Sequence, residues 1–235
     1  MRTFITSLLA LFLNAGVAFA LAPLGPPVAD LEQQQISIGF DYSFGETDVE
    51  VSGYGVSDTV DVDSDMFLAK FAYGITDGWN VFLRLGATSL DSDGFDSGTE
   101  FAWGIGTKGT VLRNDQLSWG LLGQIHWFEG DDTWAYAGYA GSSEVDAYEI
   151  KVAAGPAYRL DNVCIYGGPF LQFIEGDWDI KSGGAKYSFD VEEESAFGAY
   201  IGANLPLTEL VNFNGELQVT GDAWVLAVGL LYRLQ

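Results

Sequence analysis

The strongest constraint on this chain is an alternation of apolar and polar residues that recurs along most of its length. In residues 35–44 the apolar side chains fall on every second position, and residues 117–128 and 211–220 repeat the pattern. Alternation over eight to twelve residues is typical of a β-strand, whereas a helix would bring apolar residues back every three or four positions. Ten such segments are predicted, at 35–44, 64–75, 79–89, 100–112, 117–128, 147–160, 163–174, 195–205, 211–220 and 223–234.

The connections between these segments alternate between short and long. The short ones, at 76–78, 113–115, 161–162 and 206–209, carry turn-forming residues. The long ones, at 45–63, 90–99, 129–146 and 175–194, are rich in Gly, Ser and Asp. Short turns at one end, long loops at the other and an even strand number describe an outer-membrane barrel. We therefore expect an all-β, antiparallel, up-and-down transmembrane β-barrel over residues 35–235, with ten strands and with eight as the alternative.

The side-chain chemistry of the two faces argues against a soluble β-sandwich, the competing architecture. Small residues such as Gly104, Gly106 and Gly120 recur on the polar face, as a narrow lumen requires. Aromatic residues recur on the apolar face near both strand ends, where two membrane interfaces would select them. One predicted belt contains Tyr42, Phe67, Trp103, Trp127, Tyr148, Phe173, Phe197 and Trp224, and the other Tyr73, Trp79, Trp119, Tyr158, Phe213 and Tyr232.

The first residues read as an export signal. Arg2 precedes an apolar run at 4–13, and Ala18-Phe19-Ala20 is a small-x-small cleavage pattern, so residues 1–20 are predicted to be a signal peptide. A second such pattern ends at Ala22. Residues 21–34, with three prolines, are predicted to be a flexible periplasmic lead-in, and both termini are expected in the periplasm.

Composition excludes several classes of function. The formal net charge of −23 argues against nucleic acid, which needs a basic footprint. One Cys and one His cannot supply a Cys/His zinc site or a disulfide within the chain, so no metal or cofactor is expected. The Asp-x-Asp-x-Asp run at 61–65 is similar to the start of a calcium loop, but Met66 stands where the EF-hand pattern needs Gly.

Two segments carry a resemblance to a known family. Residues 73–79 (Tyr-Gly-Ile-Thr-Asp-Gly-Trp) are similar to a periplasmic turn, and residues 224–234 alternate like the last strand that guides barrel assembly. The chain thus resembles the small outer-membrane β-barrel proteins, which include the OmpA transmembrane domain and the opacity-type adhesins. The resemblance implies a bacterial outer-membrane location and contact of the last strand with the barrel-assembly machinery. Leu234 and Gln235 depart from the aromatic ending usual in that family.

Carried through the strands, the alternation sends a set of charged residues into the lumen. These residues are Asp41, Lys70, Arg84, Lys108, Glu149, Lys151 and Glu216. One interpretation is a structural ion-pair network that fills a narrow lumen, since unpaired buried charges are costly. The other is a water-filled pore whose constriction is set by Lys70, Arg84, Lys108 and Lys151. The strand count does not decide between them.

The predicted long loops hold most of the 33 acidic residues and are expected to form a solvated surface that contacts lipopolysaccharide through divalent cations. Trp134, Tyr136 and Tyr139 are predicted to make a binding contact, because exposed loop aromatics mark interaction sites. His126 lacks the Asp-x-His spacing of the omptin proteases, since Gln124 stands at the Asp position, and no catalytic residue is predicted.

The sequence therefore predicts a barrel with a structural or surface-interaction role and an extracellular ligand that it does not identify. A small-solute channel is the alternative, and an outer-membrane hydrolase comes third.

Overall fold

A computed structural model describes residues 22–92, 95–136, 139–193 and 196–234. The predicted signal peptide lies outside the described residues. Among the described residues, no helix is long and apolar enough to cross a membrane. The strands are β1 (Ile36–Gly53), β2 (Val56–Thr76), β3 (Trp79–Ser92), β4 (Phe95–Asp96), β5 (Glu100–Arg113), β6 (Leu117–Tyr136), β7 (Tyr139–Leu160), β8 (Val163–Ser182), β9 (Ala185–Glu193), β10 (Phe197–Pro206), β11 (Val211–Val219) and β12 (Ala223–Leu234).

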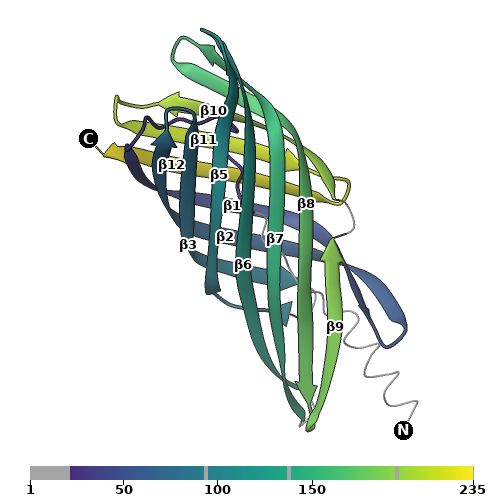
Figure 1. The fold of residues 1–235 in the computed structure, drawn as a ribbon. Helices are drawn as coiled ribbons and strands as arrows, with labels where there is room; N and C mark the ends of the chain where they lie inside the picture. Colours follow the sequence, from purple (N-terminus) through teal and green to yellow (C-terminus); the bar gives the residue numbers. More distant parts are fainter. Residues whose placement is uncertain (1–21, 93–94, 137–138, 194–195, 235) are drawn as a thin grey trace.

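Ten of these strands form a closed antiparallel ring (Figure 1). The order around the wall is β1-β2-β3-β5-β6-β7-β8-β10-β11-β12, and β12 pairs with β1 from Ile36↔Leu234 to Thr47↔Ala223. The prediction of an all-β, ten-stranded, up-and-down barrel is confirmed, and the eight-stranded alternative is wrong. Closure gives each strand of the ring a neighbour on both sides, so the backbone groups of the ring pair with one another.

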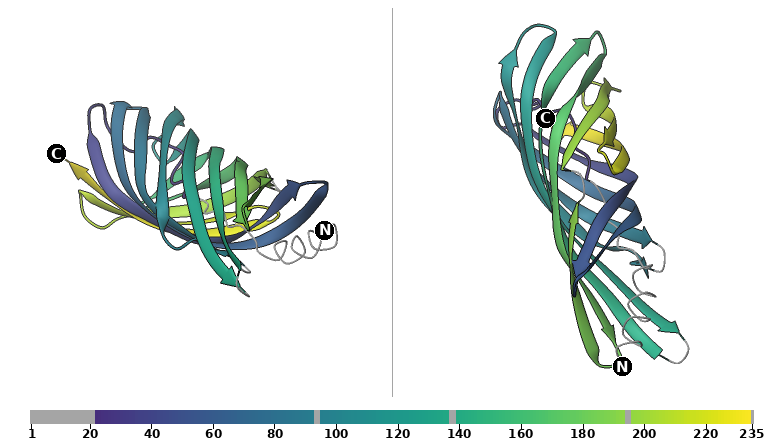
Figure 2. Two further views of the ribbon diagram at one scale, coloured as in Figure 1. Left: turned by 90° about the horizontal axis from the view of Figure 1, so that it is seen from below. Right: turned by 90° about the vertical axis from the view of Figure 1, so that its right-hand side faces the viewer.

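Three of the predicted long loops are in fact hairpins that extend the strands beyond the main ring. β1 and β2 stay paired as far as Gly53↔Val56, β6 and β7 as far as Tyr136↔Tyr139, and β8 and β9 as far as Ser182↔Ala185. The expectation of loops was wrong because the alternation of apolar and polar residues continues there, with the apolar side chains pointing inward and the polar ones outward. Gly, Ser and Asp therefore occupy strand positions. Beyond the short β11–β12 hairpin, β9 pairs directly with β1 at residues 49–52, which closes the wall again (Figures 1 and 2).

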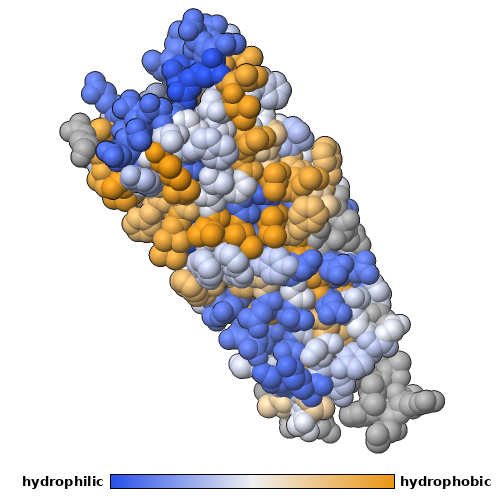
Figure 3. Space-filling view, in the orientation of Figure 1, coloured by the Kyte–Doolittle hydropathy of each residue, from blue (hydrophilic) through white to orange (hydrophobic). Residues whose placement is uncertain are grey.

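At mid-wall the apolar side chains point outward and the polar ones inward. Phe40, Phe71, Leu85 and Ile105 are exposed, and an apolar band crosses the outer surface between two hydrophilic ends (Figure 3). Aromatic side chains flank this band, including Phe67 and Trp224 toward the extended hairpins and Trp79, Trp119 and Tyr232 toward the short turns. An apolar exterior with aromatic flanks is what a bilayer-spanning wall requires.

The two faces exchange their chemistry beyond the aromatic belt nearest the extended hairpins. We call this part the outer extension; it comprises residues 45–65, 89–92, 95–100, 129–136, 139–146 and 175–193. Here carboxylates point outward, and apolar side chains point inward and pack into a dry cluster. The cluster includes Val49, Val51, Val62, Leu90, Phe95, Val145, Trp178, Ile180, Phe189 and Val191 of the outer extension, and it continues into the ring through Met66, Leu68, Phe128 and Ile174. The outer extension is thus built like a water-soluble barrel continuous with a membrane barrel.

The predicted flexible lead-in occupies the barrel interior instead. Ala22 and Leu24 are 0% and 1% exposed, and the chain reaches the surface only at residues 32–34, just before β1. The prediction of a flexible segment was wrong because it weighed the prolines and glutamines but not the apolar residues between them. Leu24 and Leu31 pack against lumen-facing side chains of the wall. We call residues 22–31 the lumen segment.

Candidate functional site: a filled lumen and an acidic outer wall

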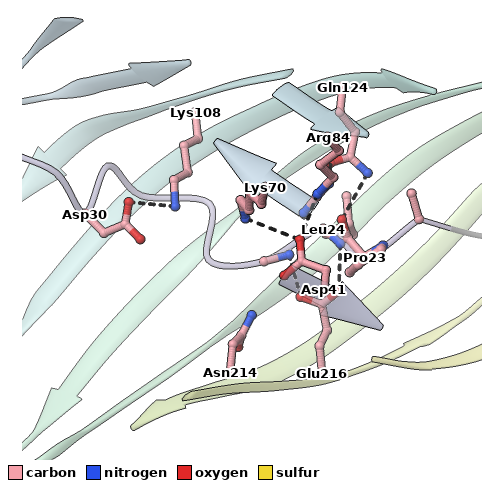
Figure 4. Close-up of polar contacts among 12 residues, drawn as sticks. Pro23, Leu24, Asp30, Asp41, Lys70, Arg84, Lys108, Gln124, Asn214 and Glu216 are labelled. Carbon is pink, nitrogen blue, oxygen red and sulfur yellow. Dashed lines mark hydrogen bonds and ion pairs between the residues drawn. The ribbon is translucent and has the colours of Figure 1, made fainter. Parts of the chain in front are cut away.

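The middle of the lumen holds a buried cluster centred on Asp41 of β1 (Figure 4). The Asp41 carboxylate accepts a hydrogen bond from Arg84 Nε at 2.8 Å and lies 3.7 Å from Lys70 Nζ. Arg84, which is fully buried, also donates from Nη1 to Gln124 Oε1 at 2.9 Å. Its guanidinium carbon lies 4.8 Å from the centroid of the Phe82 ring. One carboxylate is therefore shared by two cations, and a ring face adds to the stabilisation of Arg84.

A second cluster lies around Glu149 of β7. Lys151 Nζ is 2.8 Å from Glu149 Oε1, and both side chains are fully buried. His126 is also fully buried, with Nδ1 3.9 Å from Glu149 Oε2. The imidazole ring lies against Gly104, where an added Cβ would come within 2.1 Å of it. The glycine on the polar face thus makes room for a neighbouring lumen side chain.

The lumen segment completes both clusters and adds a third contact. Asp30 accepts a hydrogen bond from Lys108 Nζ at 2.9 Å (Figure 4). It also accepts one from Asn80 Nδ2 at 2.7 Å. Glu216, for which the described residues provide no ion pair, accepts hydrogen bonds from the main-chain N–H groups of Leu24 and Gly25. Sequence reasoning missed Asp30 because the lumen segment has no periodicity. The signal that could have located it was the apolar content around it.

The structure therefore divides the predicted lumen residues into separate groups. Asp41, Lys70 and Arg84 lie together, as do Glu149 and Lys151. Lys108 pairs with the lumen segment, and Glu216 accepts hydrogen bonds both from the lumen segment and from Tyr166 and Gln218 of the wall. All seven are at most 8% exposed. Together the lumen segment, these charges and the apolar cluster fill the middle of the barrel and its outer end, and a hollow of about 470 Å³ lies at the short-turn end between the lumen segment and the turns.

The outer extension carries rows of carboxylates that run across neighbouring strands. In one row Glu129, Asp146, Asp177 and Asp190 are successive cross-strand partners on β6, β7, β8 and β9. A second row is formed by Asp131, Glu144 and Asp179, and a third by Glu175, Glu192 and Glu50. Directly paired side chains lie about 5 Å apart at Cβ, so these like charges repel one another.

Two carboxylates of the outer extension, which lie beyond the membrane-spanning part of the wall, have pKa values shifted in opposite directions. Partial desolvation and then the charges of Glu144, Asp131, Asp179 and Asp177 raise the pKa of Asp146 above its ordinary value. Desolvation acts in the same direction on Asp179, but hydrogen bonds from Lys186 and Ser188 outweigh it, so its pKa is lowered. The row centred on Asp146 thus carries uncompensated negative charge.

A hollow of about 380 Å³ lies where the carboxylate rows meet the aromatic belt. Its aromatic side is formed by Phe101 and by Trp103 and Trp127, whose rings stack with centroids 4.2 Å apart. Its acidic side includes the Glu129–Asp190 row, and Tyr148 Oη donates a hydrogen bond to Glu175. The hollow combines ring faces with carboxylates at the level of the membrane surface, which suits cations.

The remaining predicted site residues lie elsewhere in the outer extension. Trp134, Tyr136 and Tyr139 occupy the end of the β6–β7 hairpin by their backbone pairing, and their side chains lie outside the described residues. The Asp residues at 61–65 project from the outer face of β2, two residues apart on an extended strand. In the described part of the chain, no three His, Cys, Asp or Glu side chains converge as metal ligands.

Solved structures show which class of protein this fold belongs to. The chain is similar to the outer membrane protease OmpT from Escherichia coli, with a TM-score of 0.54 and 9% identity over 88% of this chain and 99% of that one. It is also similar to the translocator domain of the autotransporter NalP from Neisseria meningitidis, with a TM-score of 0.50 and 10% identity over 87% and 90% of the two chains. The fold is therefore that of the outer-membrane β-barrels, as the sequence predicted.

Sequence comparison adds no narrower assignment. No protein-family model matches the chain, and no curated protein matches it. The particular role must therefore be argued from the geometry of the lumen and the outer wall.

Proposed function

We propose that this protein is an integral outer-membrane barrel that does not conduct solutes and that acts through the acidic surface of its outer extension. The observation that carries the proposal is the exchange of faces beyond the aromatic belt, where carboxylates turn outward and a dry apolar cluster fills the interior. The same exchange that seals the barrel presents the acidic surface to the outside.

Two kinds of filling, one charged and one apolar, support the non-conducting half of the proposal. The charged clusters and the lumen segment fill the middle of the barrel, and the apolar cluster fills its outer end. His126 lies among these buried groups at 0% exposure, so we assign it a packing role and no catalytic one. The small-solute channel is the alternative that a conductance measurement would reveal.

The position of the carboxylate rows supports an interaction partner at the membrane surface. The Glu129–Asp190 row borders the aromatic belt and therefore lies at the depth of lipid headgroups. Phosphates of lipopolysaccharide and protein carboxylates repel each other directly, but hard divalent cations take oxygen ligands from both. We therefore propose cation-bridged lipopolysaccharide as the partner, with the short-turn end and the last strand toward the periplasm and the assembly machinery.

The experiment compares two triple variants with the same change in charge. One carries Asp146→Asn, Asp177→Asn and Asp190→Asn on the outer extension. The other carries Asp115→Asn, Asp161→Asn and Glu209→Gln at the short turns. Energy transfer from tryptophan to dansyl-labelled lipopolysaccharide is measured in phosphatidylcholine vesicles, with magnesium and with EDTA.

Magnesium should enrich lipopolysaccharide around the parent protein and the short-turn variant, and much less around the outer variant. Equal enrichment around both variants would show that net charge, not the outer rows, governs the association and would contradict the proposal.

A further inference from the structure

The wall holds the lumen segment mainly through its backbone. The Ala22 N–H donates to Glu149 Oε2 at 3.1 Å, and the Ala22 carbonyl accepts from Lys151 Nζ at 2.9 Å and from Gln218 Nε2 at 3.3 Å. The Pro23 carbonyl accepts from Gln124 Nε2 at 3.2 Å (Figure 4). Main-chain contacts of this kind recognise a peptide with little regard to most of its side chains.

The carboxylate of Glu216 binds the main chain of the next two residues. The N–H groups of Leu24 and Gly25 donate to the two oxygens of Glu216 at 2.9 and 2.7 Å. In a buried site, a carboxylate without a cation needs such donors to offset its desolvation. Without the lumen segment, Glu216 would lose these two donors. Tyr166 Oη and Gln218 Nε2 of the wall also donate to Glu216, at 3.0 and 2.8 Å, so the lumen segment supplies two of the four donors that the described residues give this carboxylate.

Two side chains add selectivity to this main-chain recognition. Leu24 is 1% exposed in a pocket formed by Leu122, Ala153, Ala157, Tyr166, Phe170 and Tyr200. Six residues further along, the Asp30 carboxylate meets Lys108 and Asn80. The wall thus contacts an apolar side chain deep in the lumen, that of Leu24, and an acidic side chain nearer the short-turn end, that of Asp30.

The lumen segment joins the wall through one exposed link. Residues 32–34 are exposed, Gln34 adopts a positive φ of 67°, and its N–H donates to the Gly74 carbonyl before β1 begins at Ile36. The chain reverses at this point from the lumen into the wall. Cutting the link would therefore leave every strand of the ring intact.

From these contacts we propose that the lumen is a binding site for a peptide that enters from the short-turn end and bends inside the barrel, and that this chain fills the site with its own residues 22–31, in which Gly25 has a positive φ of 82°. The ligand class is a peptide with an apolar side chain at the Leu24 position and a carboxylate at the Asp30 position. The inference goes beyond the proposed surface role and does not depend on it.

The experiment uses the full folded chain with a protease recognition site in place of residues 32–34. After refolding in detergent micelles, the link is cut and the protein is passed over a sizing column. A dye-labelled synthetic peptide of residues 22–31 is then added, and its incorporation is followed by fluorescence anisotropy. An uncut sample is the control for non-specific association with the micelle.

We expect the cut segment to remain bound on the column and to exchange with the labelled peptide at one peptide per barrel. An Asp30→Asn peptide should bind at least about tenfold more weakly, because it loses a charge-assisted hydrogen bond. In a barrel with Lys108→Gln this difference between the two peptides should shrink.

Three results would overturn the inference. In the first, the cut segment is lost on the column and the labelled peptide does not bind afterwards. In the second, the cut segment stays bound and does not exchange with the labelled peptide under any condition that leaves the barrel folded. In the third, cut and uncut protein take up the labelled peptide equally.

Discussion

At the scale of single residues, the titration of the outer extension is set by what stands opposite each carboxylate. Asp146 faces Glu129 on one side and Asp177 on the other, while Asp179 receives hydrogen bonds from Lys186 and Ser188. Because the raised pKa of Asp146 exceeds its value in the unfolded chain, its ionised form destabilises the fold. That cost is present at neutral pH and disappears as the pH falls below the ordinary Asp range near 4.

Asp146→Asn should therefore raise the free energy of unfolding at pH 7, by up to about 1 kcal/mol, with no gain near pH 3.5. Asp179→Asn is the matched control, with the opposite sign, because its pKa is lowered and its ionised form is stabilising at pH 7. Urea unfolding in micelles, followed by tryptophan fluorescence at both pH values, measures the two effects. Effects of the same sign at pH 7 would contradict this assignment of the charges.

At the scale of strands, the alternating side chains of β9 face two environments, which are the apolar interior of the outer extension and its exposed outer surface. Val191 is 1% exposed inside the outer extension and Glu192, its neighbour, is exposed on the outer wall. β9 pairs with β8 and with β1, so it closes the wall where the β11–β12 hairpin ends (Figure 2). The burial of its apolar face, rather than contact with lipid, stabilises this strand.

Val191→Asp should destabilise the protein by about 3 kcal/mol or more, since the new carboxylate would be buried without a partner. Glu192→Val changes the outer face of the same strand and should alter stability by no more than about 0.5 kcal/mol. Urea unfolding of the two variants tests the direction of both faces. If Val191→Asp were as stable as the parent, the interior of the outer extension would have to be hydrated.

At the scale of the whole molecule, the barrel is closed twice by different chemistry. Charges and the lumen segment fill its middle, and apolar side chains fill its outer end. Removing the charges would disturb the middle of the lumen but leave in place the apolar side chains of the outer end, such as Val49, Ile180 and Val191.

The refolded protein should insert into a planar bilayer and stay electrically silent, and the Lys70→Gln, Arg84→Gln double variant should stay silent as well. Insertion is checked by the shift in gel mobility between heated and unheated samples. Discrete openings whose ion selectivity changes in the double variant would establish the channel alternative and refute the proposed non-conducting role.

The sequence by itself determined the wall. Period-two alternation, turn residues and aromatic positions are local properties, so they predicted ten strands, the outward apolar face and the lumen-facing charges from Asp41 to Glu216. Only the tertiary structure decided what the wall encloses. Residues 22–31 are aperiodic, and their burial depends on partners such as Glu149 and Glu216, more than a hundred residues away. The outer extension was misread for the same reason, because its strands are stabilised by an interior that exists only once distant hairpins pack together.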